Sequence, residues 1–262
     1  MPSTTLLGAF GQGNFGDEWI LQRAMERYPQ ARVLSRGELP PGVEKARGIA
    51  PFLVLPGGAL FQDKTSPFSF WWYLFQVVVH LWGGARVIAQ DQDLSELKNG
   101  WLRDWIRWII QHPRVSFAMR PGERVIWDTI EGEDGVNPLN LSVAPTKEHL
   151  WVPSPWSSQP PTSFDGLFFS DGRGDWEKEE VAVYRHQPGK VDRSAQFILD
   201  HHHITSARYH PLLLAWMAGR PALAIGPEHG KLHHLAQRAG YPWGEECSSD
   251  LVPHPPTQVW GP

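Results

Sequence analysis

Two stretches far apart in the sequence carry side chains suited to anion binding and proton transfer. Arg208 and His210 lie two residues apart, so on the extended end of a strand their side chains would face the same side. A guanidinium group binds carboxylates and phosphates through paired hydrogen bonds, and an imidazole changes its charge near neutral pH. Asp17 follows a glycine-rich loop near the start of the sequence and could accept a proton. We expect His210 to serve as a general acid or a phosphate ligand, and Asp17 as a general base.

The glycine-rich loop matches a dinucleotide-binding fingerprint only in part. The next expected strand ends in Ser35-Arg36, where such a fingerprint needs an acidic residue for the ribose. Asp17 and Glu18 open the helix after the loop, and their carboxylates would repel a pyrophosphate. The loop therefore favours a neutral ligand with hydroxyl groups; the alternative is that Asp17 only caps the helix. The glycines that match the G-x-G-x-x-G spacing are Gly11, Gly13 and Gly16.

A run of histidines attracts attention as a metal site but lacks the supporting pattern. It reads Asp200-His201-His202-His203, and adjacent side chains on a strand point to alternate faces. No H-E-x-x-H motif or cysteine pair accompanies it. We expect no functional metal there.

Alternating strands and helices predict an α/β fold with parallel sheets. In the first half, the expected strands are 4–10, 31–35, 52–55, 85–90 and 115–119, and the expected helices are 18–28, 68–82, 97–111 and 122–130. In the second half, the expected strands are 166–170, 181–184, 203–206 and 222–225, and the expected helices are 194–199, 211–218 and 230–239.

Proline and serine dominate residues 152–164, a composition typical of a domain linker. We therefore expect an N-terminal α/β domain at 1–151 and a C-terminal α/β domain at 165–262. Two doubly wound, Rossmann-like domains of this kind would face each other across a cleft, in a GT-B-like arrangement. Their ligands would bind at the carboxyl ends of the strands.

The composition of the 262 residues restricts the classes of partner. The formal net charge of −4 gives no basic excess that would favour nucleic acid. Cys247 is the only cysteine, so an intramolecular disulfide is excluded and a reducing cytoplasm is favoured. The first residues do not have the pattern of a signal peptide. The apolar segment at 68–82 is too short to span a bilayer and is either a core helix or a helix on a membrane surface.

Four motifs, in order, resemble those of the polysaccharide pyruvyltransferase family, in particular its cell-wall-polymer enzymes. The first is the glycine loop with Asp17, Glu18 and Ile20-Leu21 after it, and the second is LPGGALFQD at 55–63 with TSP at 65–67. The third is SARYH at 206–210, similar to the family's S-x-R-Y-H, and the fourth is Ala224-Ile225 followed by Lys231.

The resemblance implies a transferase that moves a pyruvyl group, as a ketal, from phosphoenolpyruvate to a sugar. The acceptor would belong to a cell-surface polysaccharide or its lipid-linked precursor, in the cytoplasm or at the inner face of the membrane. No cofactor is implied beyond the donor substrate. The residues expected to bind the donor are Arg120, Arg208, His210 and Lys231. The other expected site residues are Asp17, Gly13, Asn14, Gly57, Gly58, Gln62 and Asp63.

Two segments depart from the family pattern. The sequence AQDQDL at 89–94 stands where the family has A-Q-G-I-G-P, and Met119-Arg120-Pro121 stands where it has V-R-D. Three alternative functions stay open. They are an NADP-dependent oxidoreductase with Arg36 on the 2′-phosphate, a non-catalytic glycan-binding remnant of the family, and a nucleotide-sugar glycosyltransferase.

Overall fold

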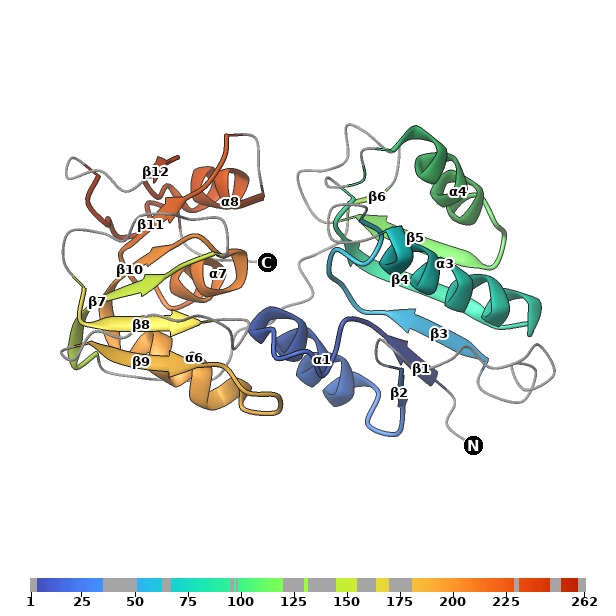
Figure 1. The fold of residues 1–262 in the computed structure, drawn as a ribbon, viewed down its shortest axis with the longest axis horizontal. Coiled ribbons are helices and arrows are strands. Elements are labelled where there is room, and N and C mark those ends of the chain that lie inside the picture. The colour runs from blue at the N-terminus through green and yellow to red at the C-terminus, as the bar shows by residue number, and fades with distance from the viewer. Residues whose placement is uncertain are drawn as a thin grey trace. The chain divides into compact units, whose positions relative to one another are not determined.

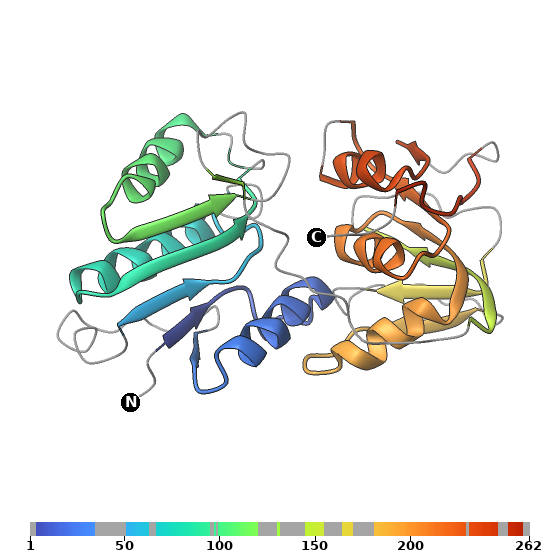
Figure 2. The same ribbon diagram turned by 180° about the vertical axis from the view of Figure 1, so that it is seen from behind.

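The computed structural model describes residues 4–34, 51–62, 67–94, 97, 99–119, 130–131, 145–154, 164–169, 181–228, 231–245 and 251–258. The chain forms two compact units, which Figures 1 and 2 show from opposite sides. Unit 1 comprises Met1–Gly11 and Trp19–Asn137, and unit 2 comprises Gln12–Glu18 and Pro138–Pro262. A short segment next to the first strand therefore belongs to the unit that contains the C-terminal half of the chain.

Unit 1 is built on a sheet whose described strands are all parallel, in the order β2-β1-β3-β4-β5-β6. The strands are β1 (Thr4–Leu7), β2 (Arg32–Leu34), β3 (Phe52–Leu55), β4 (Arg86–Gln92), β5 (Val115–Met119) and β6 (Ile130–Glu131). The helices are α1 (Phe15–Arg27), α3 (Pro67–Trp82) and α4 (Gly100–Ile110). Only the later turns of α1 belong to this unit.

Apolar residues of α3 and α4 pack on one face of the first sheet. Phe70 and Leu74 of α3 and Ile106 of α4 join a single core cluster with Leu53 of β3 and Val87 of β4. The two helices follow strands that step in the same direction across the sheet, so right-handed crossovers place them on the same face. Figure 1 shows both helices in front of the sheet and Figure 2 shows them behind it.

Unit 2 has a second sheet of parallel strands, in the order β12-β11-β10-β7-β8-β9. The strands are β7 (Lys147–Val152), β8 (Gly166–Phe169), β9 (Ala182–Arg185), β10 (His201–Ser206), β11 (Ala222–Ile225) and β12 (Trp243–Gly244). The helices α6 (Val191–Leu199), α7 (Tyr209–Met217) and α8 (Lys231–Ala239) pack side by side. The fold is therefore mixed α/β with two parallel sheets, as expected from the alternation of strands and helices.

The division between the units differs from the expected linker at 152–164. Strand β7 pairs with β10 on one side and with β8 on the other, so the expected linker falls between two neighbouring strands of one sheet. The chain instead passes to unit 2 at Asn137 and Pro138. A proline- and serine-rich composition marks an irregular connection, and such a connection occurs within a domain as well as between domains.

Two other expectations about the elements also change. The first helix begins at Phe15 rather than at residue 18. The expected helix at 122–130 lies outside the described residues except for Ile130, which is in β6. None of the helices in the described ranges is long and apolar enough to cross a bilayer.

Candidate functional site

Ser206 fixes the conformation of the chain where β10 meets α7. Its buried hydroxyl oxygen accepts a hydrogen bond from the Arg208 backbone N–H at 3.1 Å and donates to the Arg208 carbonyl oxygen at 2.9 Å. These bonds hold Arg208 in an extended conformation, with φ −127° and ψ 140°, immediately before α7. The half-buried Arg208 side chain donates from Nε to the Pro153 carbonyl oxygen at 3.4 Å. Arg208 is thus positioned at the carboxyl edge of the second sheet.

The sequence suggested that His210 lies on the extended end of a strand, but the structure places it in a helix. Strand β10 ends at Ser206, and Tyr209 and His210 are the first two residues of α7. The change follows from Ser206, whose bonds to Arg208 end the strand and let the helix begin. Arg208 therefore precedes α7 and His210 lies in the first turn of this helix. The two side chains do not share one face of a strand.

The His210 imidazole lies directly against Gly16 in the first turn of α1. A Cβ atom built on Gly16 would overlap the imidazole ring. Glycine is therefore needed at this position because of the close approach of His210, and not because of a backbone angle. The contact brings the glycine loop and the SARYH segment, which are distant in sequence, side by side within unit 2.

Asn14 caps α1. The Asn14 side-chain oxygen accepts a hydrogen bond from the Gly16 N–H at 3.0 Å, and its carbonyl oxygen accepts from the Glu18 N–H at 3.0 Å. Gly11 and Gly13 before it adopt φ of 73° and 75°, which side chains disfavour. Asp17 is half-buried in the first turn, three residues after Asn14.

Phe15 anchors the start of α1 inside unit 2. Its fully buried ring meets the rings of Phe168 and His186 edge-on, each with centroids 5.6 Å apart. His186 Nδ1 lies 2.7 Å from the Ser194 hydroxyl oxygen, and both side chains are buried. Burial lowers the His186 pKa to about 4, so this imidazole is neutral at physiological pH. No motif in the sequence indicates this pair, because a single histidine after a strand is not a recognisable pattern.

Lys231 is the first residue of α8, which follows β11. Strand β11 is the neighbour of β10, so α7 and α8 both begin at the carboxyl edge of the second sheet. Helix N-termini carry unpaired N–H groups and a partial positive charge, which favour bound anions. Arg208, His210 and half-buried Lys231 therefore add three cationic or titratable side chains to an edge that already favours anions.

Gly57, Gly58 and Gln62 belong to unit 1, at the carboxyl end of β3. Gly58 donates its N–H to the Asp91 carbonyl oxygen at 3.3 Å and accepts from the Asp93 N–H at 3.0 Å. Gly57 and Gly58 have φ of 149° and 102°, within the region that favours glycine. The glycine-rich turn at 57–58 is therefore hydrogen-bonded to the segment at 89–94, which departs from the pyruvyltransferase pattern.

Asp91 occupies the position in that segment where the family has its first glycine. Its φ is 48°, and it is the only non-glycine residue with positive φ in the described part of the chain. Asp and Asn enter this left-handed region more readily than other side chains. The backbone turn that glycine would favour is thus present with an aspartate. Arg120 and Asp63, both expected in the site, lie outside the described residues.

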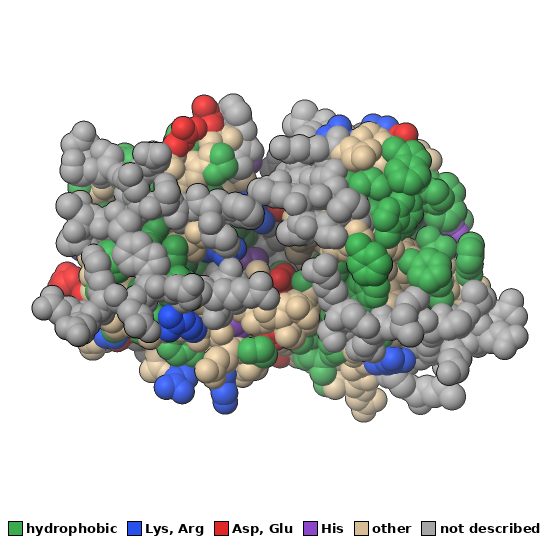
Figure 3. Space-filling model, in the orientation of Figure 1, with side chains coloured by type: hydrophobic (Ala, Val, Ile, Leu, Met, Phe, Trp, Pro, Cys, Tyr) green, Lys and Arg blue, Asp and Glu red, His purple; other side chains and the backbone are tan. Residues whose placement is uncertain are grey.

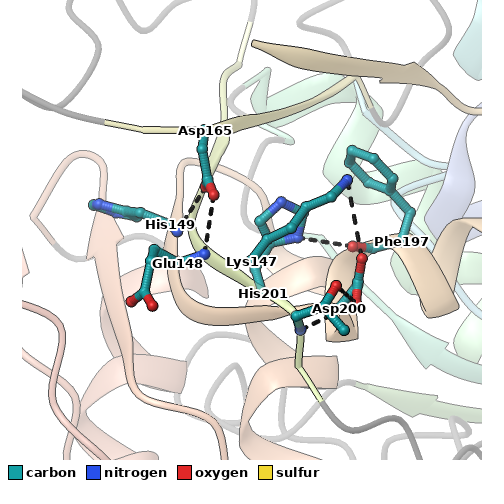
Figure 4. A network of polar contacts seen from close by, with 8 residues as sticks. Lys147, Glu148, His149, Asp165, Phe197, Asp200 and His201 are labelled. Carbon is teal, nitrogen blue, oxygen red and sulfur yellow. Dashed lines mark hydrogen bonds and ion pairs between the residues drawn. The ribbon is translucent and has the colours of Figure 1, made fainter. Parts of the chain in front are cut away.

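A second polar cluster gathers at the opposite, amino edge of the second sheet (Figure 4). The Asp165 carboxylate accepts hydrogen bonds from the backbone N–H groups of Glu148 and His149 at 3.0 and 2.8 Å. Burial opposes ionisation of Asp165, but these bonds lower its pKa overall. Lys147 Nζ lies 3.9 Å from the Asp200 carboxylate. The cluster thus joins the starts of β7 and β8 to the turn before β10.

His201 explains the histidine run as a structural feature. Its Nδ1 lies 2.9 Å from the Phe197 carbonyl oxygen, and its ring fills the space over Gly166, where a Cβ atom would overlap it. Burial lowers the His201 pKa. Within the described ranges, no group of three or more His, Cys, Asp or Glu side chains could hold a metal ion. Ligands of open α/β sheets bind at the carboxyl edge, so the cluster of Figure 4 is better explained as a brace between strands.

The fold places the chain in the class of α/β proteins built on two parallel sheets. In sequence, neither a protein-family model nor a curated protein matches it. Among solved structures, the chain is similar to KP1_0663, a functionally uncharacterised protein from Klebsiella pneumoniae subsp. pneumoniae NTUH-K2044. The TM-score is 0.53 and the identity 14%, over 90% of this chain and 88% of that one. Similarity at this identity shows the fold alone.

A second structure is more remote. The spinosyn forosaminyltransferase SpnP matches with a TM-score of 0.44 and 12% identity, over 93% of this chain and 85% of that one. This likeness is too weak to bear on either fold or function.

Proposed function

We propose that this protein is a GT-B-like transferase of two Rossmann-like domains that moves a pyruvyl group from phosphoenolpyruvate to a sugar. The acceptor is a glycan or a lipid-linked glycan of a cell-surface polysaccharide. One observation carries the proposal. The His210 imidazole rests on Gly16, so two motifs shared with the pyruvyltransferases lie side by side within one compact unit.

The carboxyl edge of the second sheet suits the donor. Phosphoenolpyruvate carries a carboxylate and a phosphate on three carbons, so it needs several cations and N–H donors. Arg208 and Lys231 stand at the starts of α7 and α8, where helix dipoles add to their charge. Arg120 is the further cation that the resemblance supplies. We assign these residues to the donor together with His210.

The chemistry needs a proton donor, a proton acceptor and a cationic site for the leaving group. The methylene carbon of phosphoenolpyruvate takes a proton and becomes a methyl group, which leaves the central carbon cation-like. Two sugar hydroxyls then form C–O bonds to that carbon, and the bond to the phosphate oxygen breaks. Of the two hydroxyl protons, one balances the methyl group and the other departs with phosphate. We assign His210 to the phosphate and its proton, and Asp17 to a sugar hydroxyl.

The test measures phosphate release from phosphoenolpyruvate in the presence of candidate N-acetylhexosamine acceptors. His210→Ala and Asp17→Asn should each lower turnover by about 10²–10⁴-fold, the usual range for acid–base groups. His210→Ala should also weaken phosphoenolpyruvate binding, whereas Asp17→Asn should leave it nearly unchanged. His202→Ala is the matched control, because that histidine is exposed near the amino edge of the same sheet.

Other outcomes point to the alternative functions. Glycan binding without turnover of phosphoenolpyruvate would identify a non-catalytic remnant. A thermal shift with NADPH would favour the oxidoreductase, and a shift with a UDP-sugar would favour a glycosyltransferase. Normal turnover of Asp17→Asn would remove the base from Asp17, and Asp63 and Asp91 would be the next candidates.

A further inference from the structure

Exposed hydrophobic side chains gather on one side of unit 1 (Figure 3), and the large ones on its helices α3 and α4 are aromatic. Of the exposed large hydrophobic residues in the part of the chain that the structure describes, all but Val252 lie on α3 or α4. Their exposed fractions range from 38% to 73%, which is unusual for tryptophan and phenylalanine. We call this surface the aromatic face; it consists of Phe68, Phe75 and Trp82 of α3 and Trp101, Trp105 and Trp108 of α4.

The aromatic face is continuous across the two helices. Phe68, Phe75 and Trp82 recur every seven residues, so they lie along one side of α3. Half-buried Trp71 connects them to α4, because its ring centroid lies 5.2 Å from that of Trp101 and 6.0 Å from that of Trp105. Contiguous apolar patches of this kind mark surfaces that bind a partner.

The aromatic face is not needed to build the core. Helix α4 already buries Leu102, Ile106 and Ile109 against the sheet, so its tryptophans form a second apolar side. Helix α3 contains no Asp, Glu, Lys or Arg in its 16 residues. A helix that is apolar on all sides is normally covered on all sides.

The charged groups beside the aromatic face are mainly cationic. Exposed Arg107 and half-buried Arg103 project from α4, and exposed Arg86 starts the strand after α3. Asp104 is the one exposed acidic residue described in this part of unit 1, and it pairs with Arg107 at 2.9 Å. A partner that covers the aromatic face should therefore combine apolar and anionic groups.

We propose that the aromatic face docks on the surface of a bilayer that contains anionic phospholipids. Tryptophan has an apolar ring and one N–H donor, and it favours the boundary between headgroups and acyl chains. Arginines at the edge of the face would bind lipid phosphates. Helix α3 is about 24 Å long and the bilayer core about 30 Å thick, so α3 lies on the membrane and does not span it. Docking of this kind involves unit 1 alone and is independent of the proposed transferase activity.

Two other occupants fit the charges less well. A second copy of the chain would present the same excess of positive charge, and like charges oppose such an interface. A single-stranded nucleic acid could stack on the tryptophans, but it also needs cations along its backbone. Helix α3 provides none.

The experiment is co-sedimentation of the full chain with phosphatidylcholine vesicles, with and without phosphatidylglycerol. The wild-type protein should bind the anionic vesicles more tightly, and added salt should weaken this binding. Changing Trp101 and Trp108 together to Gln should lower the partition coefficient by about ten-fold or more. Arg107→Gln should lower it by about five-fold on anionic vesicles only. The matched controls are Val252→Gln, an exposed apolar residue of unit 2, and Arg27→Gln, an exposed arginine at the end of α1.

Several results would overturn the proposal. One is failure of the wild-type protein to bind anionic vesicles at low salt, and another is equal binding by the tryptophan variant with an unchanged melting temperature. Sedimentation velocity tests the second copy: a dimer that the tryptophan variant dissociates, without vesicle binding, would assign the face to self-association. Tight binding of a labelled oligo-dT, lost in the same variant, would assign it to nucleic acid. Quenching of tryptophan fluorescence by brominated lipids in the wild type alone would support the membrane.

Discussion

Gly16 has no side chain, and this allows the His210 imidazole to lie against the first turn of α1. We predict that Gly16→Ala displaces His210 and costs about 1–3 kcal/mol of stability, the usual range for an overpacked site. The proposed pyruvyl transfer should fall with it. In a His210→Ala background the same change should be neutral or stabilising, because the overlap is gone and alanine favours a helix. Thermal unfolding of the four proteins in this cycle measures the coupling.

Gly100→Ala is the control for the Gly16 cycle. Gly100 also lies in the first turn of a helix, but a Cβ atom there would meet no other atom within 4 Å. This change should leave stability equal or slightly higher. If Gly16→Ala destabilised the protein equally with and without His210, the contact between the two residues would not be the reason for the glycine.

The buried histidine His186 should make stability depend on pH. Its pKa is about 4 in the folded protein, against about 6.5 when unfolded. Above pH 6.5 neither the folded nor the unfolded state binds the proton, so His186 does not lower the stability of the folded state. As the pH falls from 6.5 to 4, the unfolded state binds a proton that the folded state does not, and stability falls by about 3 kcal/mol in total. Urea unfolding at pH 7.5 and pH 4.5 should show this loss.

His186→Asn isolates that effect, because Asn can still pair with the Ser194 hydroxyl at the position of Nδ1. The variant should lose much less stability on acidification than the wild type. His80 and His201 also have pKa values lowered by burial, but both proteins contain them, so their effects cancel in the comparison. Equal acid sensitivity of the two proteins would contradict the assignment to His186.

At the residue scale, the sequence identified the candidate residues more successfully than it predicted the role of each one. The glycine loop could be recognised by its motif. The sequence could not show that Gly16 leaves room for His210, because a contact between distant segments produces no periodic pattern in the sequence. The sequence drew attention to Asp17 as a helix cap but not to Asn14, which accepts the Gly16 N–H. His186 and Ser194 were missed because burial and pairing leave no mark on local sequence.

Two helices begin with an asparagine cap, and only one of these lies in the candidate site. Asn14 and Asn99 each accept a backbone N–H at 3.0 Å through the side-chain oxygen. Asn14→Ala and Asn99→Ala should therefore each cost about 1 kcal/mol of stability. Only Asn14→Ala should also lower the proposed pyruvyl transfer. Chemical denaturation and phosphate release measure the two effects separately.

Asn14→Asp distinguishes the cap from the ligand contact. Aspartate caps a helix as well as asparagine but has no amide N–H to donate to a sugar hydroxyl. We expect normal stability and reduced transfer. Normal transfer in Asn14→Asp would limit this residue to the cap.

Helices and strands with strong periodicity were predictable at the element scale. The strands at 52–55, 115–119 and 222–225 agree with β3, β5 and β11, and the segment at 68–82 agrees closely with α3. Strand β7 was missed because its first half, Lys147-Glu148-His149, is polar and lies at the sheet's amino edge. The expected domain boundary at 152–164 differs from the observed one for the same reason. When β7 is not recognised, the proline-rich segment after it resembles a linker.

The whole molecule consists of two units whose cores should respond separately to mutation. Phe15 and Phe70 are both fully buried, but Phe15 belongs to unit 2 and Phe70 to unit 1. Each change to alanine should cost about 3–5 kcal/mol. In hydrogen exchange, Phe15→Ala should deprotect β8 and α6, whereas Phe70→Ala should deprotect α3 and β3. Loss of protection in unit 1 strands alone after Phe15→Ala would place the segment at 12–18 with unit 1.

The discontinuous make-up of unit 2 sets an order of events during synthesis. Phe15 leaves the ribosome long before Phe168 and His186, against which its ring packs. At about 5–20 residues per second, the interval is on the order of ten seconds. During this time unit 1 can fold on the nascent chain, while Phe15 in the first turn of α1 has no Phe168 or His186 to pack against. The segment with Phe168 and His186 must therefore fold onto one that was made much earlier, and a product that stalls before Phe168 would leave Phe15 exposed to chaperones and proteases.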